Sequence, residues 1–247
     1  EQPFPIEPYF LTFVRNNNAK KISYASSIGI SSLDSRQIKD FSRWLSSYDA
    51  ISVREPDAAK ILQPHLKQKI EIVADPTFLL DVNEWKLLAC DYSERGYILC
   101  FMLGLQPALL NEALRVSNDL GKKLIVIGQR DIPKDKRYTL IDDAGPKEFL
   151  GLIKSSDCVF TDSFHGTVFS ILLGVKNFFS YVAKGNRRAS RLETLLSPLG
   201  FWDRIIRNDD FSKVDGLLRR GIDVEKLNIM LEDKSNASRR FLDKYIK

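Results

Sequence analysis

Residues 161–167 hold the side chains best suited to chemistry in this sequence. They read TDSFHGT and follow an apolar stretch. A histidine such as His165 can act as a general acid or base near neutral pH. If a helix starts beside it, the backbone N–H groups of Gly166 and Thr167 favour a bound phosphate or carboxylate. We therefore predict proton transfer by His165 and anion binding by Ser163, Gly166 and Thr167.

A structural alternative exists for the same segment. Asp162 or Ser163 can simply cap the helix while His165 hydrogen-bonds a nearby carbonyl group. The sequence has two histidines, His65 and His165, and only His165 lies at a predicted strand-to-helix corner. This position favours the functional interpretation, with Asp162 in the wall of the site.

A second polar segment places Arg54 at the end of a predicted strand over 50–53. A guanidinium group binds carboxylate or phosphate through two parallel hydrogen bonds. An ion pair with Glu55 or Asp57 is an equally good explanation of this arginine. A Pro-marked turn further along makes Asp75 another candidate for the wall of the site, although such turns are more often structural.

A basic segment, KGNRR over 184–188, follows another predicted strand, and Arg191 lies one helical turn further on. Runs of charged residues usually lie on a solvent-exposed surface, and such a location is enough to explain Arg188 and Arg191. The position after a strand favours anion binding by Lys184 and Arg187.

All these segments belong to an alternating pattern of strands and helices. The first series has predicted strands at 21–25, 50–53 and 70–73 and helices at 34–46 and 56–62. The second has strands at 97–103, 123–127, 158–161 and 177–181, helices at 107–120, 146–154, 167–173 and 188–196, and a helical pattern from 209 onward. Such alternation predicts an α/β fold with parallel sheets, which bind ligands beyond the carboxyl ends of their strands.

The stretch 81–94 separates the two series, so we predict domains at 1–90 and 91–247. The first domain, with about three strands, is too short for a complete Rossmann-like domain. Because the chain opens at Glu1 rather than at a methionine, we expect the natural start to lie upstream.

The composition narrows the functional classes. The chain has 247 residues, of which 44% are hydrophobic and 28% charged, so a disordered chain is excluded. The net charge of +5 suits anionic small molecules or a phospholipid surface as ligands, and it is lower than the charge expected of a dedicated nucleic-acid binder.

The three cysteines lack metal or redox spacing, which predicts free thiols in a reducing compartment. Walker A, GxGxxG, GxSxG, HExxH and CxxC motifs are absent, and the apolar runs are shorter than the roughly 20 residues of a membrane span.

Five segments, taken in order, resemble the polysaccharide pyruvyl transferase family. They are KISYASS (21–27), SVRE (52–55), VADPT (73–77), TDSFHG (161–166) and the stretch 187–199. The resemblance runs from about residue 9 to residue 201. It implies two Rossmann-like lobes similar to those of GT-B glycosyltransferases, with an incomplete acceptor lobe over 1–90 and a donor lobe with C-terminal helices over 91–247.

The resemblance also implies an activity. Members of this family transfer a pyruvyl group from phosphoenolpyruvate to two hydroxyls of one sugar, which makes a cyclic ketal and releases phosphate. The acceptor would be a sugar of a surface polysaccharide or its lipid-linked precursor, and no metal or cofactor is expected. His165 matches the family's histidine before glycine and Arg54 its first-domain arginine. The residues expected to bind phosphoenolpyruvate are Arg54, Ser163, Gly166, Thr167, Lys184 and Arg187.

The free thiols and the mild net charge predict a cytoplasmic protein that can contact the inner face of the membrane and has no nucleic-acid partner. Two departures from the family stand out. Relatives open with a further βα portion that ends in a Gly-Ser-Asp-Gln-type segment, and some carry an arginine where this chain has Ser163.

Two other functions are compatible with these residues. A GT-B glycosyltransferase would bind a uridine or guanosine nucleotide in place of phosphoenolpyruvate. A non-catalytic binding protein of a polysaccharide locus would keep its biological role when His165 is replaced.

Overall fold

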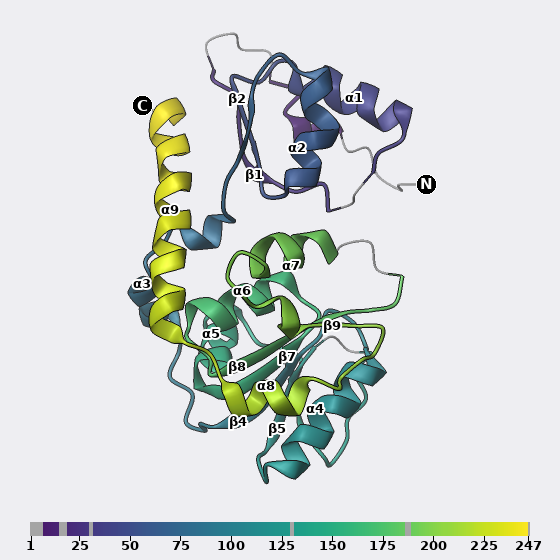
Figure 1. Cartoon of the computed structure of the whole chain (residues 1–247), viewed down its shortest axis with the longest axis vertical. Helices are drawn as coiled ribbons and strands as arrows, with labels where there is room; N and C mark the ends of the chain where they lie inside the picture. The colour runs from purple at the N-terminus through teal and green to yellow at the C-terminus, as the bar shows by residue number, and fades with distance from the viewer. Residues whose placement is uncertain (1–6, 15–18, 30–31, 129–130, 186–188, 247) are drawn as a thin grey trace. The chain divides into compact units, whose positions relative to one another are not determined.

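The computed structural model describes residues 7–14, 19–29, 32–128, 131–185 and 189–246 (Figure 1). The chain divides into two compact units. Unit 1 consists of Glu1–Leu79 and Leu231–Lys247, and unit 2 consists of Leu80–Met230. Each unit contains its own sheet, as the sequence predicts.

The sheet of unit 1 has three parallel strands in the order β1-β2-β3. They are β1 (Ile22–Ser26), β2 (Ala50–Val53) and β3 (Ile70–Ile72), and they alternate with α1 (Ser35–Leu45) and α2 (Pro56–Leu62). Short 3₁₀ turns form η1 (Glu7–Phe10), η2 (Gln63–His65) and η3 (Pro76–Phe78). The predicted cap of the first helix is confirmed: Asp34 Oδ1 accepts from Gln37 N at 2.8 Å, and Gln37 Oε1 accepts from Asp34 N at 3.0 Å.

Both faces of this sheet are covered, because side chains along a strand alternate between its two faces. Ile51 and Val53 of β2 pack in one cluster with Leu45 of α1 and Leu62 of α2. Ala50, on the opposite face of β2, packs in another cluster with Phe241. Phe241 belongs to α9 (Val224–Ile246), whose residues from Leu231 onward are part of unit 1.

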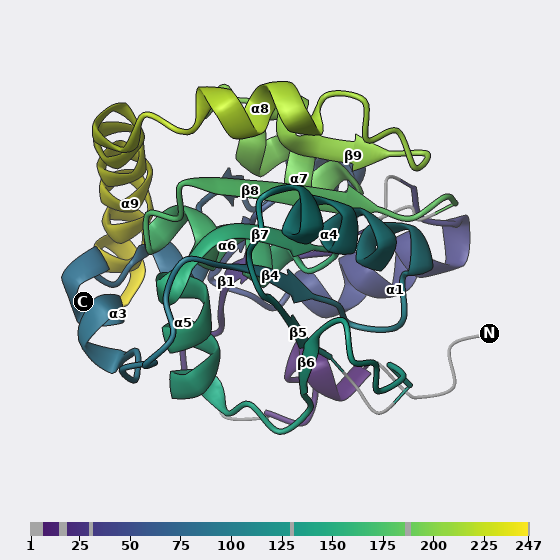
Figure 2. The same cartoon turned by 90° about the horizontal axis from the view of Figure 1, so that it is seen from below.

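The sheet of unit 2 has six parallel strands in the order β6-β5-β4-β7-β8-β9. The strands are β4 (Tyr97–Phe101), β5 (Leu124–Ile127), β6 (Thr139–Ile141), β7 (Ser156–Thr161), β8 (Asn177–Val182) and β9 (Ile205–Arg207). The helices are α3 (Val82–Leu88), α4 (Pro107–Asp119), α5 (Pro146–Ser155), α6 (Phe164–Leu172), α7 (Ala189–Leu196) and α8 (Val214–Arg220), with η4 at Trp202–Arg204. Figures 1 and 2 show the central strands β5, β4, β7 and β8 side by side.

The strand order contains a topological switch point. From β4 the chain adds β5 and β6 on one side, then crosses back to add β7, β8 and β9 on the other side. This is the Rossmann arrangement, in which ligands bind at the carboxyl ends of the strands beside the switch point. In unit 2 that place lies between β4 and β7.

The strands beside the switch point are buried on both faces, as the apolar run after residue 96 predicts. Residues 97–100 of β4 are at most 2% exposed. One face contacts α4 and α8, whose buried residues share a cluster with Ile98 and Cys100. On the other face Phe101 contacts Phe149 of α5 with 4.9 Å between ring centroids. Cys100 and Cys158 are buried free thiols, while Cys90 is partly exposed.

The structure divides the chain differently from the predicted 1–90 and 91–247. The stretch 81–94 contains α3, which belongs to unit 2 because Trp85 packs edge-on against Phe169 with 5.0 Å between ring centroids. Residues 231–247 return to unit 1, where Ala74 N donates to Ser238 Oγ at 2.8 Å. The strands β6 and β9 were not predicted, since each has only three residues and lies at a sheet edge.

Candidate functional site

A pocket of about 470 Å³ lies at the switch point of unit 2. It is lined by residues 103, 104 and 106 after β4, residues 162–165 after β7, residues 181 and 182 of β8, and residues 191 and 192 of α7. All of these segments follow or end strands of the same parallel sheet or belong to the helix that comes next. The pocket therefore has the location that a parallel α/β sheet favours for a ligand.

The helix beside the pocket, α6, starts at Phe164, three residues before the predicted start at Thr167. Its N-cap is Ser163, whose Oγ accepts from Gly166 N at 3.3 Å. Thr167 N donates to the carbonyl oxygen of Ser163 at 3.1 Å. The two N–H groups that were expected to bind an anion, those of Gly166 and Thr167, therefore already donate to the N-cap residue.

Gly166 and Thr167 lie behind the pocket wall and hold α6 against the sheet. A Cβ atom at Gly166 would lie 2.5 Å from Thr161 Oγ1 and 2.9 Å from Phe101 Cδ1. Thr167 is fully buried, and its Oγ1 lies 2.7 Å from Ser180 Oγ of β8. Neither residue is among those that line the pocket. These contacts give both residues a packing role.

His165 lines the pocket from the first turn of α6 and is exposed to solvent. Its ring lies edge-on to Phe164, with 5.4 Å between ring centroids. A solvent-accessible imidazole at the rim of a pocket is available for proton exchange with a bound molecule. The helix N-terminus beside it contributes partial positive charge that favours an anionic ligand.

Asp162 lines the pocket beside His165. Its Oδ1 accepts from Leu103 N at 2.8 Å, so the carboxylate connects the segments that follow β7 and β4. Burial raises the pKa of Asp162, while the hydrogen bonds from the Leu103 backbone and from the Gln106 side chain lower it. Asp162 is thus placed in the wall of the pocket, as predicted from its position after the strand.

Two pocket residues were missed or undervalued by sequence reasoning. Tyr181 is the last but one residue of β8 and donates from its Oη to Asp209 Oδ1 at 2.5 Å. Burial raises its pKa to about 12. Arg191 lines the pocket from α7, with its guanidinium carbon 5.8 Å from the centre of the Phe164 ring. Arg191 lies two residues after the start of α7, the helix that follows β8. The first turn of such a helix faces the carboxyl end of the strand, and this position could have predicted that Arg191 lines the pocket.

The other predicted cations are placed elsewhere. Arg54, in unit 1, forms an ion pair through Nη1 with Asp75, and its Nε lies 4.0 Å from Glu55 Oε1. The structure thus favours the ion-pair explanation of Arg54, with Asp75 as the main partner. Lys184 is exposed and is not a lining residue of the pocket, while Arg187 lies outside the described residues. The convergence of Arg54 and His165 on one cleft stays a prediction.

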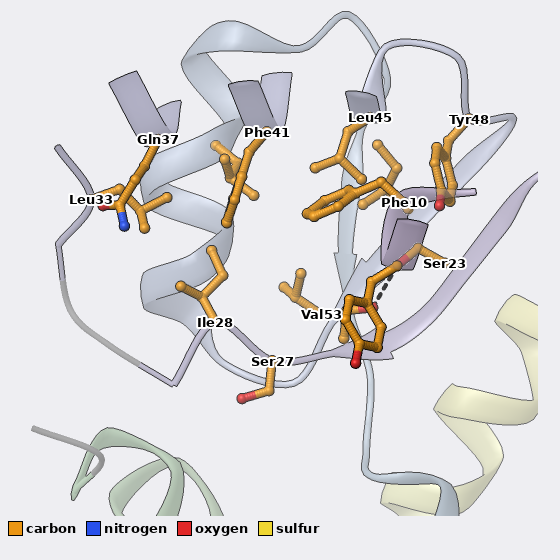
Figure 3. A pocket seen from close by; sticks show the side chains of 14 residues that line it. Phe10, Ser23, Ser27, Ile28, Leu33, Gln37, Phe41, Leu45, Tyr48 and Val53 are labelled. Atoms are coloured by element: carbon orange, nitrogen blue, oxygen red, sulfur yellow. Dashed lines mark hydrogen bonds between the residues drawn. The ribbon is translucent and has the colours of Figure 1, made fainter. Parts of the chain in front are cut away.

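Unit 1 contains a second pocket, also of about 470 Å³ (Figure 3). Its lining includes Phe10 of η1, Phe41 and Leu45 of α1, and Ser23 and Val53 of the sheet. No charged residue is among the described residues that line it. The two pockets therefore differ in character: the unit 2 pocket presents ionisable side chains and the unit 1 pocket mainly apolar ones.

The described ranges contain neither a metal-binding cluster nor a membrane-spanning helix. In that part of the chain, no group of three or more histidine, cysteine or acidic side chains is placed to hold a metal ion. The helices described there are all too short or too polar to cross a bilayer.

The parallel sheets and the switch-point pocket define a Rossmann-like α/β protein of the GT-B-like class. Solved structures with a similar fold include the UDP-GlcNAc 2-epimerase of Methanocaldococcus jannaschii, with a TM-score of 0.51 at 14% identity, covering 85% of this chain and 62% of that one. The UDP-N-acetylglucosamine 2-epimerase of Rickettsia bellii has a TM-score of 0.51 at 11% identity, and the match covers 91% of this chain and 67% of the epimerase. The glycotransferase of kitacinnamycin has a TM-score of 0.46 at 14% identity, and the match covers 82% of this chain and 58% of the glycotransferase. The chain thus spans roughly two thirds or less of the length of these proteins.

A sequence model of the family described as polysaccharide pyruvyl transferase matches residues 2–182. The chain belongs to this family. The search of curated proteins found no match.

Proposed function

We propose that this protein transfers a pyruvyl group from phosphoenolpyruvate to a sugar of a surface polysaccharide or its precursor, with the donor bound in the unit 2 pocket. The single observation that carries the proposal is that His165 and Arg191 line one pocket at the switch point of a parallel sheet. Family membership supports the transferase class.

The pocket offers suitable groups for a small dianionic donor. Arg191 supplies a planar guanidinium, which suits carboxylate and phosphate groups. The N-terminus of α6 adds partial positive charge. Arg191 therefore replaces, in our proposal, the arginine that some relatives have at the position of Ser163.

The reaction requires proton transfer at a carbon atom. Protonation of the methylene carbon of phosphoenolpyruvate leaves positive charge on the neighbouring carbon, to which a sugar hydroxyl oxygen adds with loss of its proton. Departure of phosphate, carrying the electron pair of its C–O bond, and addition of a second hydroxyl complete the ketal. His165 is the imidazole among the residues that line the pocket, and we assign the proton transfers of this reaction to it.

A nucleotide-sugar transferase is the competing function, because one similar fold is that of an epimerase in complex with UDP-GlcNAc and UDP. Calorimetric titration of the protein with phosphoenolpyruvate and, separately, with UDP distinguishes the two. We expect saturable binding of phosphoenolpyruvate that Arg191→Gln weakens at least tenfold, and no binding of UDP.

The matched control is Arg220→Gln, which changes an exposed arginine of α8 that pairs with Asp203. It should bind phosphoenolpyruvate like the natural protein. Binding of UDP without binding of phosphoenolpyruvate would reject the proposed function.

A further inference from the structure

The ketal product forms only when both sugar hydroxyls lose their protons. In the proposed reaction, His165 protonates the methylene carbon and takes the proton of the first hydroxyl, and these two transfers return the imidazole to its starting form. The proton of the second hydroxyl therefore needs another acceptor. That acceptor must reach the same pocket, because both hydroxyls belong to one sugar and add to one carbon atom.

Asp162 is the only acidic side chain among the described residues that line the unit 2 pocket. Besides His165, the other titratable side chains in that lining are those of Tyr181 and Arg191. Tyr181 donates a hydrogen bond of 2.5 Å to Asp209 and has a pKa raised to about 12, so it stays protonated near neutral pH. An arginine stays protonated as well. Asp162 is thus the side chain that is left to accept a proton.

The carboxylate of Asp162 is held in place and keeps acceptor capacity. Its Oδ1 atom accepts from Leu103 N at 2.8 Å, and the Gln106 side chain donates to the same carboxylate. Both donors belong to the segment that follows β4, so they hold the group across the switch point from β7. A carboxylate has about four lone-pair positions, more than these hydrogen bonds use, so it can also accept from a sugar hydroxyl.

The surroundings of Asp162 make it a stronger base than an exposed carboxylate. Burial raises its pKa, so its ionised form takes a proton more readily. Burial also raises the pKa of Cys100 in β4 and of Tyr181 in β8, so these two neighbours are uncharged near neutral pH. The positive groups that line the pocket are Arg191 of α7 and, when protonated, His165 of α6. Such an environment suits a group that takes up a proton and returns it within one turnover.

We propose that Asp162 is a second catalytic residue, which accepts the proton of the second sugar hydroxyl; this role rests on the proposed function. The oxygen of that hydroxyl forms a bond to the carbon atom that phosphate has left. Its O–H bond breaks, the electron pair of that bond stays on the oxygen, and the proton passes to the carboxylate of Asp162. The proton then passes to the released phosphate, which leaves Asp162 ionised for the next turnover.

Asp162→Asn tests this role, because asparagine keeps an oxygen acceptor for Leu103 N and cannot take a proton near neutral pH. The full chain is mixed with phosphoenolpyruvate and the methyl glycosides of glucose, galactose, mannose and N-acetylglucosamine, and the methyl signal of the ketal is followed by proton NMR. We expect ketal formation to fall by about 10²–10⁴-fold, the usual range for a proton-transfer residue. Near-normal ketal formation in the folded variant would overturn the proposal.

The affinity for phosphoenolpyruvate should not fall in the same variant. Removing a negative charge beside a bound anion favours binding, so calorimetric titration should give a dissociation constant equal to or below that of the natural protein. A dissociation constant raised by about tenfold or more would show that Asp162 only shapes the pocket wall, and it would also overturn the proposal.

Asp131→Asn is the matched control. Asp131 Oδ2 accepts from Leu105 N at 2.9 Å, in the same segment after β4, but Asp131 is not among the residues that line the pocket. This variant should form the ketal at the natural rate. An equal loss in both variants would assign the effect to the segment after β4 and reject the role of Asp162.

Chemical rescue tests the same role in a variant without the side chain, and it serves if Asp162→Asn does not fold. Formate supplies a small carboxylate that can take the place of the one removed in Asp162→Ala. Added formate should restore part of the ketal formation in Asp162→Ala and none in His165→Ala. No effect of formate on folded Asp162→Ala would contradict the proposal.

The natural protein separates this inference from the proposed function. Ketal formation by the natural protein, together with a natural rate in Asp162→Asn, would reject the role of Asp162 alone. Absence of ketal from the natural protein with every glycoside would reject the pyruvyl transfer proposal, and the role of Asp162 with it.

Discussion

The carboxylate of Asp162 accepts a hydrogen bond of 2.8 Å from the backbone N–H of Leu103. Asp162 follows β7 and Leu103 follows β4, so this bond connects the two strands at which the sheet order switches. The contact fixes one wall of the pocket. It also places an acidic group where burial raises its pKa.

This pKa shift predicts how stability depends on pH. Since the pKa of Asp162 is raised in the folded protein, the unfolded chain loses this proton first, at about pH 4. The contribution of Asp162 to stability is therefore highest below the unfolded pKa and decreases as the pH rises through the raised folded pKa.

Asp162→Asn keeps an oxygen acceptor for Leu103 N and removes the buried charge. We expect the variant to be at least as stable as the natural protein at pH 7, with an advantage that disappears below about pH 4. Urea unfolding across this pH range measures the difference. A variant that is clearly less stable at pH 7 would show that the ionised carboxylate is the favoured state.

The close contact of Gly166 with Thr161 and Phe101 predicts a loss of stability in Gly166→Ala. The added Cβ must displace a threonine side chain at 2.5 Å, and overpacking of this kind destabilises by about 1–3 kcal/mol. Gly216→Ala is the matched control: it changes a glycine of α8 whose Cβ would meet no heavy atom within 4 Å, and it should stabilise by about 0.5–1 kcal/mol. Equal unfolding free energies for the two variants would refute the packing role of Gly166.

The ion pair of Arg54 and Asp75 predicts a structural effect of mutation in unit 1. Their side chains are 15% and 3% exposed, so Arg54→Met leaves a buried carboxylate without its cation and should destabilise by about 3–5 kcal/mol. The double variant Arg54→Met/Asp75→Asn should recover part of this loss, because asparagine can still accept from Thr77 N. If Arg54→Met unfolds at the same urea concentration as the natural protein, the ion pair is not what holds this end of the sheet.

Arg191 should affect donor binding more than turnover. Arg191→Lys keeps the positive charge and loses the planar fork, so we expect the KM for phosphoenolpyruvate to rise about tenfold with a smaller change in kcat. Steady-state rates of phosphate release, with Arg220→Lys as the surface control, give both constants. An unchanged KM would remove Arg191 from the donor site.

Much of the fold was predictable because its signals are local. Pro56 and Pro107 begin helices as expected, Asp34 caps α1, and the apolar run of β4 marks a strand that is covered on both faces. The edge strands β6 and β9 have too few residues to show a pattern. The return of Phe241 to the sheet of unit 1 depends on contacts between residues nearly 200 positions apart, which no local window contains.

The site was predictable only in part, for a similar reason. The position of His165 after a strand was enough to place it at a sheet end, where it lines a pocket. The packing role of Gly166 in α6 depends on its close contact with Phe101, which belongs to β4 and lies far away in the sequence. The partner of Arg54 is Asp75, which lies 21 positions further along the chain. The sequence alone does not show whether an arginine pairs with a distant carboxylate of the same chain or with the carboxylate of a ligand.

In the proposed reaction, His165 transfers protons in the unit 2 pocket. The most direct measurement is the turnover of His165→Ala with phosphoenolpyruvate and a sugar acceptor, followed by phosphate release and by the mass gain of the sugar, together with the unfolding temperature of the same preparation. We predict a loss of turnover on the order of 10²–10⁴-fold with an unchanged unfolding temperature. Near-normal turnover in the folded variant, or a lowered unfolding temperature with the activity of the folded fraction preserved, would reject proton transfer by His165 and leave it as a structural residue of α6.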